Sequence, residues 1–434
     1  MQLPRSIAPL VVIAALAAAC TPGAARPTAS PATPMDVPPS AAANAVGAPS
    51  PDAWLVVGKR GVEGLQVILA STAQKDYDLP TGVPNERWGR LLTVRREGGR
   101  TIVHDLVVQP GFGGNERSID GAWALPTFGA DALPVGVSAD RQTVVLVEAA
   151  PATPGRTRFA VLRAASDTPI VIDVAGTVAY DAVSPNGSMI FVIEHLPAPP
   201  EAHYQVRAID VASRNLLPGV VVDKTGTDEA MGGWPLAQLA RPGGLVLTLY
   251  RSAEHPFIHA LQTVDNFAIC IDLPASRLDA DAAQDWGLAA APSGAVYAVN
   301  ATLGEVAQVD AGDFRVTRTA SVEPARSATI VLAKFGHSDL GPVGRRLVVS
   351  PDGATLYAAG RGGILAIRTT DLTRSGAFLD GQAVDSLGLS PDGAALYALL
   401  HAGGRIVKLD AATGRVERYV PGEGYDRLLA VAPW

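Results

Sequence analysis

Cysteine and lysine are both scarce in this sequence of 434 residues. There are two cysteines, Cys20 and Cys270, so one disulfide at most could form. Only five of the 35 basic residues are lysine, aromatic residues make up 6%, and the formal charge is −7. No basic stripe is available to neutralise a phosphate backbone, so we expect no nucleic-acid partner.

Common catalytic and metal-binding motifs are missing as well. The chain has no H-E-x-x-H, no G-x-x-x-x-G-K, no G-x-S-x-G and no EF-hand spacing. Asp279, Asp281 and Asp285 lie close together, but they lack the glycine turn and terminal glutamate of a calcium loop, so we interpret them as a solvated loop. Cys270 lies in an apolar strand and is interpreted as a small buried hydrophobic residue. The six tryptophans are interpreted as core packing.

The first 52 residues have the composition of an export signal followed by a linker. Arg5 precedes an apolar run that is too short to span a bilayer and ends in small residues. The segment Leu16-Ala-Ala-Ala-Cys20 resembles the lipobox of bacterial lipoproteins, in which the cysteine is lipid-modified. Ordinary cleavage after a small-residue motif is the alternative. We predict a lipoprotein signal peptide at residues 1–19 and a lipid anchor at Cys20. Residues 20–52, rich in Pro, Ala and Ser, would be a disordered tether.

From residue 53 to 434 the chain repeats a short apolar strand, a tight turn and another apolar strand. The clearest copies are Val349-Ser-Pro-Asp-Gly-Ala-Thr-Leu-Tyr357, Leu389-Ser-Pro-Asp-Gly-Ala-Ala-Leu-Tyr397 and Val183-Ser-Pro-Asn-Gly-Ser-Met-Ile-Phe191. Proline presets φ in a type I turn, and glycine supplies the left-handed conformation that reverses the chain. Each copy therefore predicts a hairpin. Further apolar segments bring most units to four strands, which is typical of propeller blades.

These residues resemble the blades of bacterial YVTN-type and TolB-like propellers, in which a Ser-Pro-Asp-Gly turn joins the two inner strands. The resemblance implies an all-β propeller over residues 53–434. The first segment has no inner strand before it, and the last has no outer strands after it, so the two ends would complete one blade by pairing. We predict seven or eight blades. The count favours eight, with inner strands near Val83, Val137, Val183, Leu239, Leu288, Val349, Leu389 and Leu428.

Three consecutive units have long or polar connections between their second and third strands, whereas the last two units turn back within short glycine-rich stretches. Binding groups usually lie on loops held by a rigid scaffold. We therefore predict a ligand-binding surface that could include a divalent metal held by histidine and carboxylate. The alternative is that these loop charges are simply solvated. The candidate residues are Glu148, Glu194, His195, His203, Arg251, Glu254 and His255.

No catalytic constellation is recognisable in the sequence. We therefore expect a monomeric, non-enzymatic propeller, anchored to the membrane in the cell envelope, that binds a protein or small-molecule ligand. The alternative is an extracytoplasmic hydrolase of the lactonase type, because some propellers that resemble this one are lactonases using polar groups of the central channel.

Overall fold

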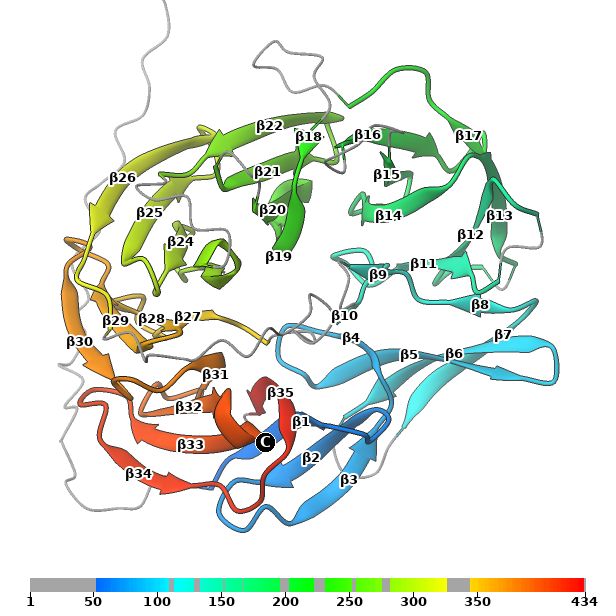
Figure 1. Ribbon diagram of the computed structural model, residues 1–434. Helices are drawn as coiled ribbons and strands as arrows, with labels where there is room; N and C mark the ends of the chain where they lie inside the picture. Colours follow the sequence, from blue (N-terminus) through cyan, green and yellow to red (C-terminus); the bar gives the residue numbers. More distant parts are fainter. Residues whose placement is uncertain are drawn as a thin grey trace, which may run out of the picture. The chain divides into compact units, whose positions relative to one another are not determined.

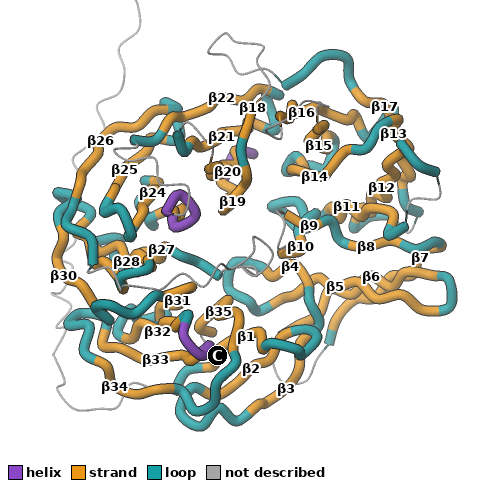
Figure 2. The backbone as a smooth tube through the Cα atoms, in the orientation of Figure 1, coloured by secondary structure: helices purple, strands orange, loops and turns teal. Residues whose placement is uncertain are grey.

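The regular structure of this protein is almost entirely β-strand. The computed structural model describes residues 52–108, 113–128, 133–150, 153–166, 168–195, 203–221, 231–251, 255–274, 282–325 and 344–432. Helical structure in these ranges is limited to three short 3-10 turns (Figure 2), which are η1 (Pro242–Gly244), η2 (Ala282–Asp285) and η3 (Ala402–Gly404). None of the described helices is long and apolar enough to cross a membrane.

The strands form eight antiparallel blades in a ring (Figure 1), which confirms the all-β propeller and the count of eight. From inner to outer strand, blade 1 holds β35 (Tyr425–Ala432), β1 (Trp54–Lys59), β2 (Leu65–Leu69) and β3 (Lys75–Leu79); blade 2 holds β4 (Gly82–Pro84), β5 (Arg90–Glu97), β6 (Arg100–Val107) and β7 (Gly114–Asp120); blade 3 holds β8 (Trp123–Ala124), β11 (Thr143–Glu148), β12 (Arg156–Arg163) and β13 (Ile170–Ala175); blade 4 holds β14 (Val178–Val183), β15 (Met189–His195), β16 (His203–Asp210) and β17 (Asn215–Leu216), with β18 (Met231–Gly232) also paired to β16.

The second half of the ring is more regular. Blade 5 holds β19 (Trp234–Arg241), β20 (Leu245–Arg251), β21 (Phe257–Gln262) and β22 (Phe267–Asp272); blade 6 holds β23 (Trp286–Ala290), β24 (Val296–Asn300), β25 (Glu305–Asp310) and β26 (Arg315–Ser321); blade 7 holds β27 (Leu347–Val349), β28 (Thr355–Gly360), β29 (Gly363–Arg368) and β30 (Arg374–Phe378); blade 8 holds β31 (Val384–Leu389), β32 (Ala395–Leu400), β33 (Arg405–Asp410) and β34 (Val416–Tyr419).

Blade 1 closes the ring with strands from both ends of the propeller, as predicted. In Figure 1 the red β35 lies beside the blue β1. The two strands pair antiparallel, with Leu55 opposite Val431 and Val57 opposite Leu428, and two register shifts bend the pair. Because β35 pairs with the edge that β1 would otherwise expose, β1 has a hydrogen-bonded neighbour on both sides.

Blade 3 is the irregular one. Its inner position is shared by the two-residue strand β8, which pairs with one end of β11, and by a single bridge between Val137 and Val144. The small hairpin of β9 (Thr127–Phe128) and β10 (Leu133–Pro134) lies between these segments in the sequence. The predicted inner strand near Val137 is thus present only as a bridge.

The repeated turns join the inner strand of a blade to the next strand through one set of hydrogen bonds. The Ser350 hydroxyl donates to Asp352 Oδ1 at 2.5 Å and accepts the Thr355 amide at 2.8 Å. Ser390 makes the same contacts with Asp392 and Ala395. These polar groups are satisfied within the turn, and each repeat therefore folds back locally.

Apolar side chains fill the spaces between neighbouring blades. One cluster joins blades 7 and 8 and includes Ile364, Leu387 and Leu396, all fully buried. Burial of each such side chain contributes about 1.5 to 3 kcal/mol, so the interfaces supply most of the stabilisation of the ring. Trp286 is 2% exposed and fits the packing interpretation, but Trp234 is 54% exposed, so for that residue the interpretation is wrong.

The two faces of the ring carry different connections. Turns between first and second strands lie on one face, which we call the turn face. On the opposite face, the loop face, lie the connections between second and third strands and those between one blade and the next, because successive strands run antiparallel. Of the predicted ligand-binding residues that the structure describes, His255 belongs to a connection on the loop face, and the others lie at the strand ends that meet this face, namely Glu148, Glu194, His195, His203 and Arg251.

Candidate functional site

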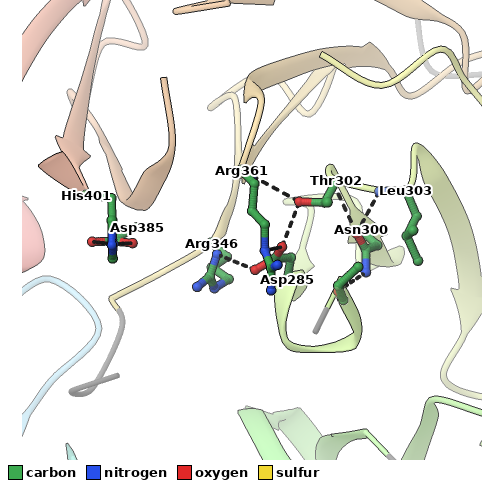
Figure 3. Close-up of polar contacts among 9 residues, drawn as sticks. Asp285, Asn300, Thr302, Leu303, Arg346, Arg361, Asp385 and His401 are labelled. Atoms are coloured by element: carbon green, nitrogen blue, oxygen red, sulfur yellow. Dashed lines mark hydrogen bonds and ion pairs between the residues drawn. The ribbon is translucent and has the colours of Figure 1, made fainter. Parts of the chain in front are cut away.

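A buried ion cluster lies on the loop face, where the inner strands of blades 6 and 7 begin (Figure 3). Asp285 is the last residue of η2 and is 3% exposed. Its Oδ1 forms an ion pair with Nη1 of Arg346 at 3.1 Å, and its Oδ2 accepts from Nε of Arg361 at 2.9 Å and from the Thr302 hydroxyl at 2.7 Å. We call Asp285, Thr302, Arg346 and Arg361 the rim cluster. It joins the two blades by charge-assisted hydrogen bonds.

Asn300, the last residue of β24, holds the acidic side of the rim cluster in place. Its amide nitrogen donates to the Ala282 carbonyl at 2.8 Å, and its Oδ1 accepts the amides of Thr302 at 3.1 Å and Leu303 at 3.0 Å. The Asn300 side chain is fully buried. One side chain therefore fixes both η2, which carries Asp285, and the turn that carries Thr302.

The two arginines come from backbone that packs closely against the neighbouring blades. A Cβ atom on Gly360 would lie 2.9 Å from Ala301 Cβ, so glycine allows the turn of Arg361 to approach blade 6. The Arg361 amide then donates to the Thr302 hydroxyl at 3.0 Å. The carbonyl of Arg346 accepts from Ala359 of blade 7, and that of Arg345 accepts from Leu387 of blade 8. Arg346 is thereby held at the inner rim.

A second polar pair lies on blade 8. His401 Nδ1 is 3.1 Å from Oδ1 and 3.2 Å from Oδ2 of Asp385, and in Figure 3 Arg346 lies between this pair and Asp285. The hydrogen bond to Asp385 raises the pKa of His401, while burial, Arg346 and Arg60 oppose that rise. The pair thus gains positive charge on mild acidification.

Sequence reasoning missed this site. Asp285 was expected in a solvated loop, and that interpretation is wrong because the carboxylate is buried between two guanidinium groups. Arg346 and Arg361 occur 61 and 76 residues later, so spacing alone could not identify them. Short glycine-rich turns bring Arg361 and His401 near the inner rim, and this arrangement is visible only in the structure. In the sequence, loop length pointed instead to the connections of blades 3 to 5.

The acidic residues predicted on blades 3 and 4 each pair within their own blade. Glu148 Oε1 accepts from Arg158 Nη1 at 2.6 Å. Glu194 Oε2 accepts from Gln205 at 2.6 Å and from Arg207 at 3.0 Å. These carboxylates are therefore neutralised locally by their own strands.

The other predicted site residues are spread over the same face. His195 ends β15 and is exposed, and Arg251 ends β20 opposite Trp234, where burial lowers the guanidinium pKa. His255 Nε2 lies 2.8 Å from Asp272 Oδ1. The described residues do not bring the predicted set into one group.

Three of the predicted residues fall at least in part outside the described residues. These are Cys20, Glu254 and the side chain of His203, the first residue of β16. Among the described residues, no group of three or more His, Cys, Asp or Glu side chains is arranged to hold a metal ion. A metal held by the long loops therefore stays a prediction.

Cys270 of blade 5, interpreted from the sequence as a small buried hydrophobic residue, lies next to a buried histidine. His259 is 1% exposed in β21, and its Nδ1 is 4.0 Å from the Cys270 sulfur of β22. The His259 ring also packs edge-on against Tyr250, with centroids 6.4 Å apart. Cys270 is partly buried, rather than fully buried as expected, and packs against the apolar cluster between blades 4 and 5.

Comparison with known proteins adds support for the architecture. No protein-family model matches the chain, and no curated protein matches it. Among solved structures, apo AztD from Citrobacter koseri superposes with a TM-score of 0.50 at 13% identity, over 86% of this chain and 97% of that chain. Dihydro-heme d1 dehydrogenase NirN gives 0.48 at 12% identity, over 86% and 74% of the two chains. Dipeptidyl peptidase 4 from Porphyromonas gingivalis gives 0.47 at 11% identity, over 85% and 58%. The likeness to apo AztD shows the fold alone.

Proposed function

We propose that this protein is a binding propeller of the bacterial cell envelope, attached to the membrane through lipid-modified Cys20 and a tether, that binds its ligand or partner on the loop face. One observation carries the proposal. Fixed charged side chains from blades 6, 7 and 8 gather at the inner rim of that face, with Asp285 buried between Arg346 and Arg361. On the turn face, in contrast, serine and aspartate side chains form their hydrogen bonds within the turns themselves.

The chemistry of the rim cluster favours recognition over catalysis. Asp285 accepts two hydrogen bonds and forms ion pairs with two cations, so it holds the arginines rather than acting as a base or nucleophile. Arginines immobilised in this way have already lost their conformational freedom, which lowers the cost of binding. The exposed aromatic residue Trp234 on the loop face suits the same role, because tryptophan is enriched at binding hot spots.

Photocrosslinking from matched positions on the two faces tests this proposal. Val62 lies in a loop-face connection of blade 1 and is 38% exposed, and Val264 lies in a turn-face connection of blade 5 and is 63% exposed. We expect a photoreactive residue at position 62 to crosslink a ligand or partner in intact cells, with position 264 giving none. A product that forms only from position 264, or from neither position, would contradict the proposal.

A lactonase-type hydrolase is the second candidate, and the His401–Asp385 pair is the observation that favours it. A histidine oriented by a carboxylate at the inner rim can act as a general acid or base. If this interpretation is right, a lactone or phosphoester panel will reveal activity that His401→Ala lowers by about 10²-fold or more. His255→Ala, which removes an equivalent histidine–aspartate pair on blade 5, is the matched control and should keep the activity. Equal losses of activity in both variants would mean that His401 has no specific role in the mechanism.

A further inference from the structure

A groove lies on the turn face between blades 7 and 8, on the opposite side of the ring from the rim cluster. Its volume is about 470 Å³, which is in the range of small-molecule sites. All of its lining residues fall within residues 350–412, a stretch that the structure describes without a gap. The lining includes Asp352, Tyr357, Arg368 and Phe378 of blade 7, and Asp392 and Ala411 of blade 8.

Two aspartates of the repeated turns, Asp352 and Asp392, each bring one available carboxylate oxygen to the groove. Oδ1 of each accepts from the serine hydroxyl two residues earlier and from the amide two residues later. Oδ2 of each accepts no hydrogen bond from a described residue, and neither carboxylate forms an ion pair within the described ranges. The serine hydroxyls hold the pKa of both carboxyls below its ordinary value, so both are ionised at neutral pH.

The cationic side chain in the lining is already neutralised. Arg368 pairs with Asp371, and its Nη2 lies 3.0 Å from Oδ2 of that aspartate. The same nitrogen donates to the Thr373 hydroxyl at 2.7 Å, so the guanidinium is bound within its own turn. The carboxylates of Asp352 and Asp392 are therefore not offset by a described cation, and the groove is negatively charged.

Contacts between blades 7 and 8 fix the walls of the groove. The Tyr357 hydroxyl donates to the Ala411 carbonyl of the neighbouring blade at 2.9 Å. The ring of Tyr357 lies beside that of Phe378, with centroids 6.2 Å apart. A Cβ atom on Gly393 would lie 2.7 Å from Pro351 Cδ, so glycine allows the two turns to pack closely. Because the walls are formed in advance, little ordering is needed on binding.

From this arrangement we infer that the groove is a second binding site, for a small molecule that carries a primary ammonium group on an aliphatic stem. The inference goes beyond the proposed function, which concerns the opposite face. An ammonium is a compact charge with three donors, whereas a guanidinium pairs best with both oxygens of one carboxylate. The turns leave only Oδ2 of Asp352 and of Asp392, which favours the ammonium. Tyr357 and Phe378 supply apolar and cation-attracting wall surface for the stem and its charge.

Ligand-observed NMR titration of the purified full chain with n-butylammonium, n-butylguanidinium and neutral butanol tests the inference. We expect n-butylammonium to bind, n-butylguanidinium to bind more weakly and butanol not to bind. The affinity of the wild type for n-butylammonium should also fall between low salt and about 0.5 M NaCl, because the groove is open to solvent and salt screens its charge.

Asparagine replacements remove the carboxylates without removing the turn. In the corresponding turn of blade 4, Oδ1 of Asn186 accepts from the Ser184 hydroxyl at 3.0 Å, so asparagine supports the same fold. Asp352→Asn and Asp392→Asn should each weaken n-butylammonium binding about ten-fold or more, because a hydrogen bond to a charged group is lost. Asp140→Asn is the matched control. It changes the same turn of blade 3, outside the groove, and should bind like the wild type.

Four results would overturn the inference. These are absence of n-butylammonium binding, equal binding of butanol, tighter binding of n-butylguanidinium, and a loss in Asp140→Asn that equals the loss in the groove variants. N-acetyl-lysine methylamide carries the same ammonium as part of a peptide, and its binding without that of the free amine would contradict a small-molecule ligand. Crosslinking from position 62 does not depend on this groove, so the proposed function is tested separately.

Discussion

Removal of residues 425–434 is expected to abolish the cooperative thermal unfolding of the propeller. The deletion takes away β35, whose Tyr425, Leu428 and Leu429 are 6%, 0% and 7% exposed. It also uncovers β1, where Leu55 and Val57 are fully buried. At about 1.5 to 3 kcal/mol for each buried side chain, the loss is on the order of 10 kcal/mol, which approaches the whole net stability of an ordinary domain.

Circular dichroism melting and limited proteolysis would measure this effect. A synthetic peptide of residues 421–434 should restore part of the transition, because β35 pairs with β1 without needing a covalent link to β34. Leu428→Asp, like the deletion, should weaken the cooperative thermal transition. Val416→Asp, on the outer strand β34 at 40% exposure, is its matched control and should leave the transition nearly unchanged. A truncated chain that melts at the wild-type temperature would mean that closure of blade 1 does not hold the ring together.

This closure could be predicted from the sequence because its causes are local. Turn residues such as Pro351 and Gly353 impose the hairpin wherever they occur, and Gly353 adopts a φ of +73° in the structure. Two incomplete end segments then leave one arrangement that covers both sheet edges. The eight inner strands follow from the same local pattern, although blade 3 replaces most of its inner strand with an irregular segment that the pattern did not describe.

The rim cluster could not be predicted because its residues are far apart in the sequence and come together only when neighbouring blades pack. An aspartate in a polar segment has the same sequence signature whether it is solvated or buried, and Asp285 differs only in having Arg346 and Arg361 brought to it by the next blade. Loop length was also a poor guide. Two of the loop-face groups at the inner rim, Arg361 and His401, belong to the short connections of blades 7 and 8.

Asp181 is a second buried carboxyl that the sequence did not reveal, and its environment differs from that of Asp285. It lies at a register shift of β14 and is 2% exposed. Nε2 of Gln238 approaches its Oδ1 at 3.4 Å, and no described cation forms an ion pair with it. Burial therefore raises the pKa of Asp181 to about 7, and the Gln238 contact opposes the rise.

Replacement of Asp181 by asparagine should stabilise the protein at neutral and alkaline pH. In the unfolded chain the carboxyl has its ordinary pKa, near 3.8, so between about pH 4 and pH 7 the folded protein holds a proton that the unfolded chain has released. The free energy of unfolding of the wild type falls as pH rises through that window and then levels off above it. The amide of the Asp181→Asn variant does not titrate, so the gain is largest at about pH 8, with a ceiling on the order of 4 kcal/mol.

Denaturant titrations at about pH 5 and pH 8 would measure the difference between variant and wild type, in which the titration of all other groups cancels. Asp210→Asn is the matched control from the same blade. Its carboxyl is exposed and accepts the Ser213 amide at 2.7 Å, and these contacts lower its pKa rather than raise it. The control should therefore give no gain at the higher pH. Equal pH dependence in Asp181→Asn and the wild type would mean that Asp181 is ionised in the folded protein at neutral pH, and that a cation or a rearranged Gln238 compensates its burial.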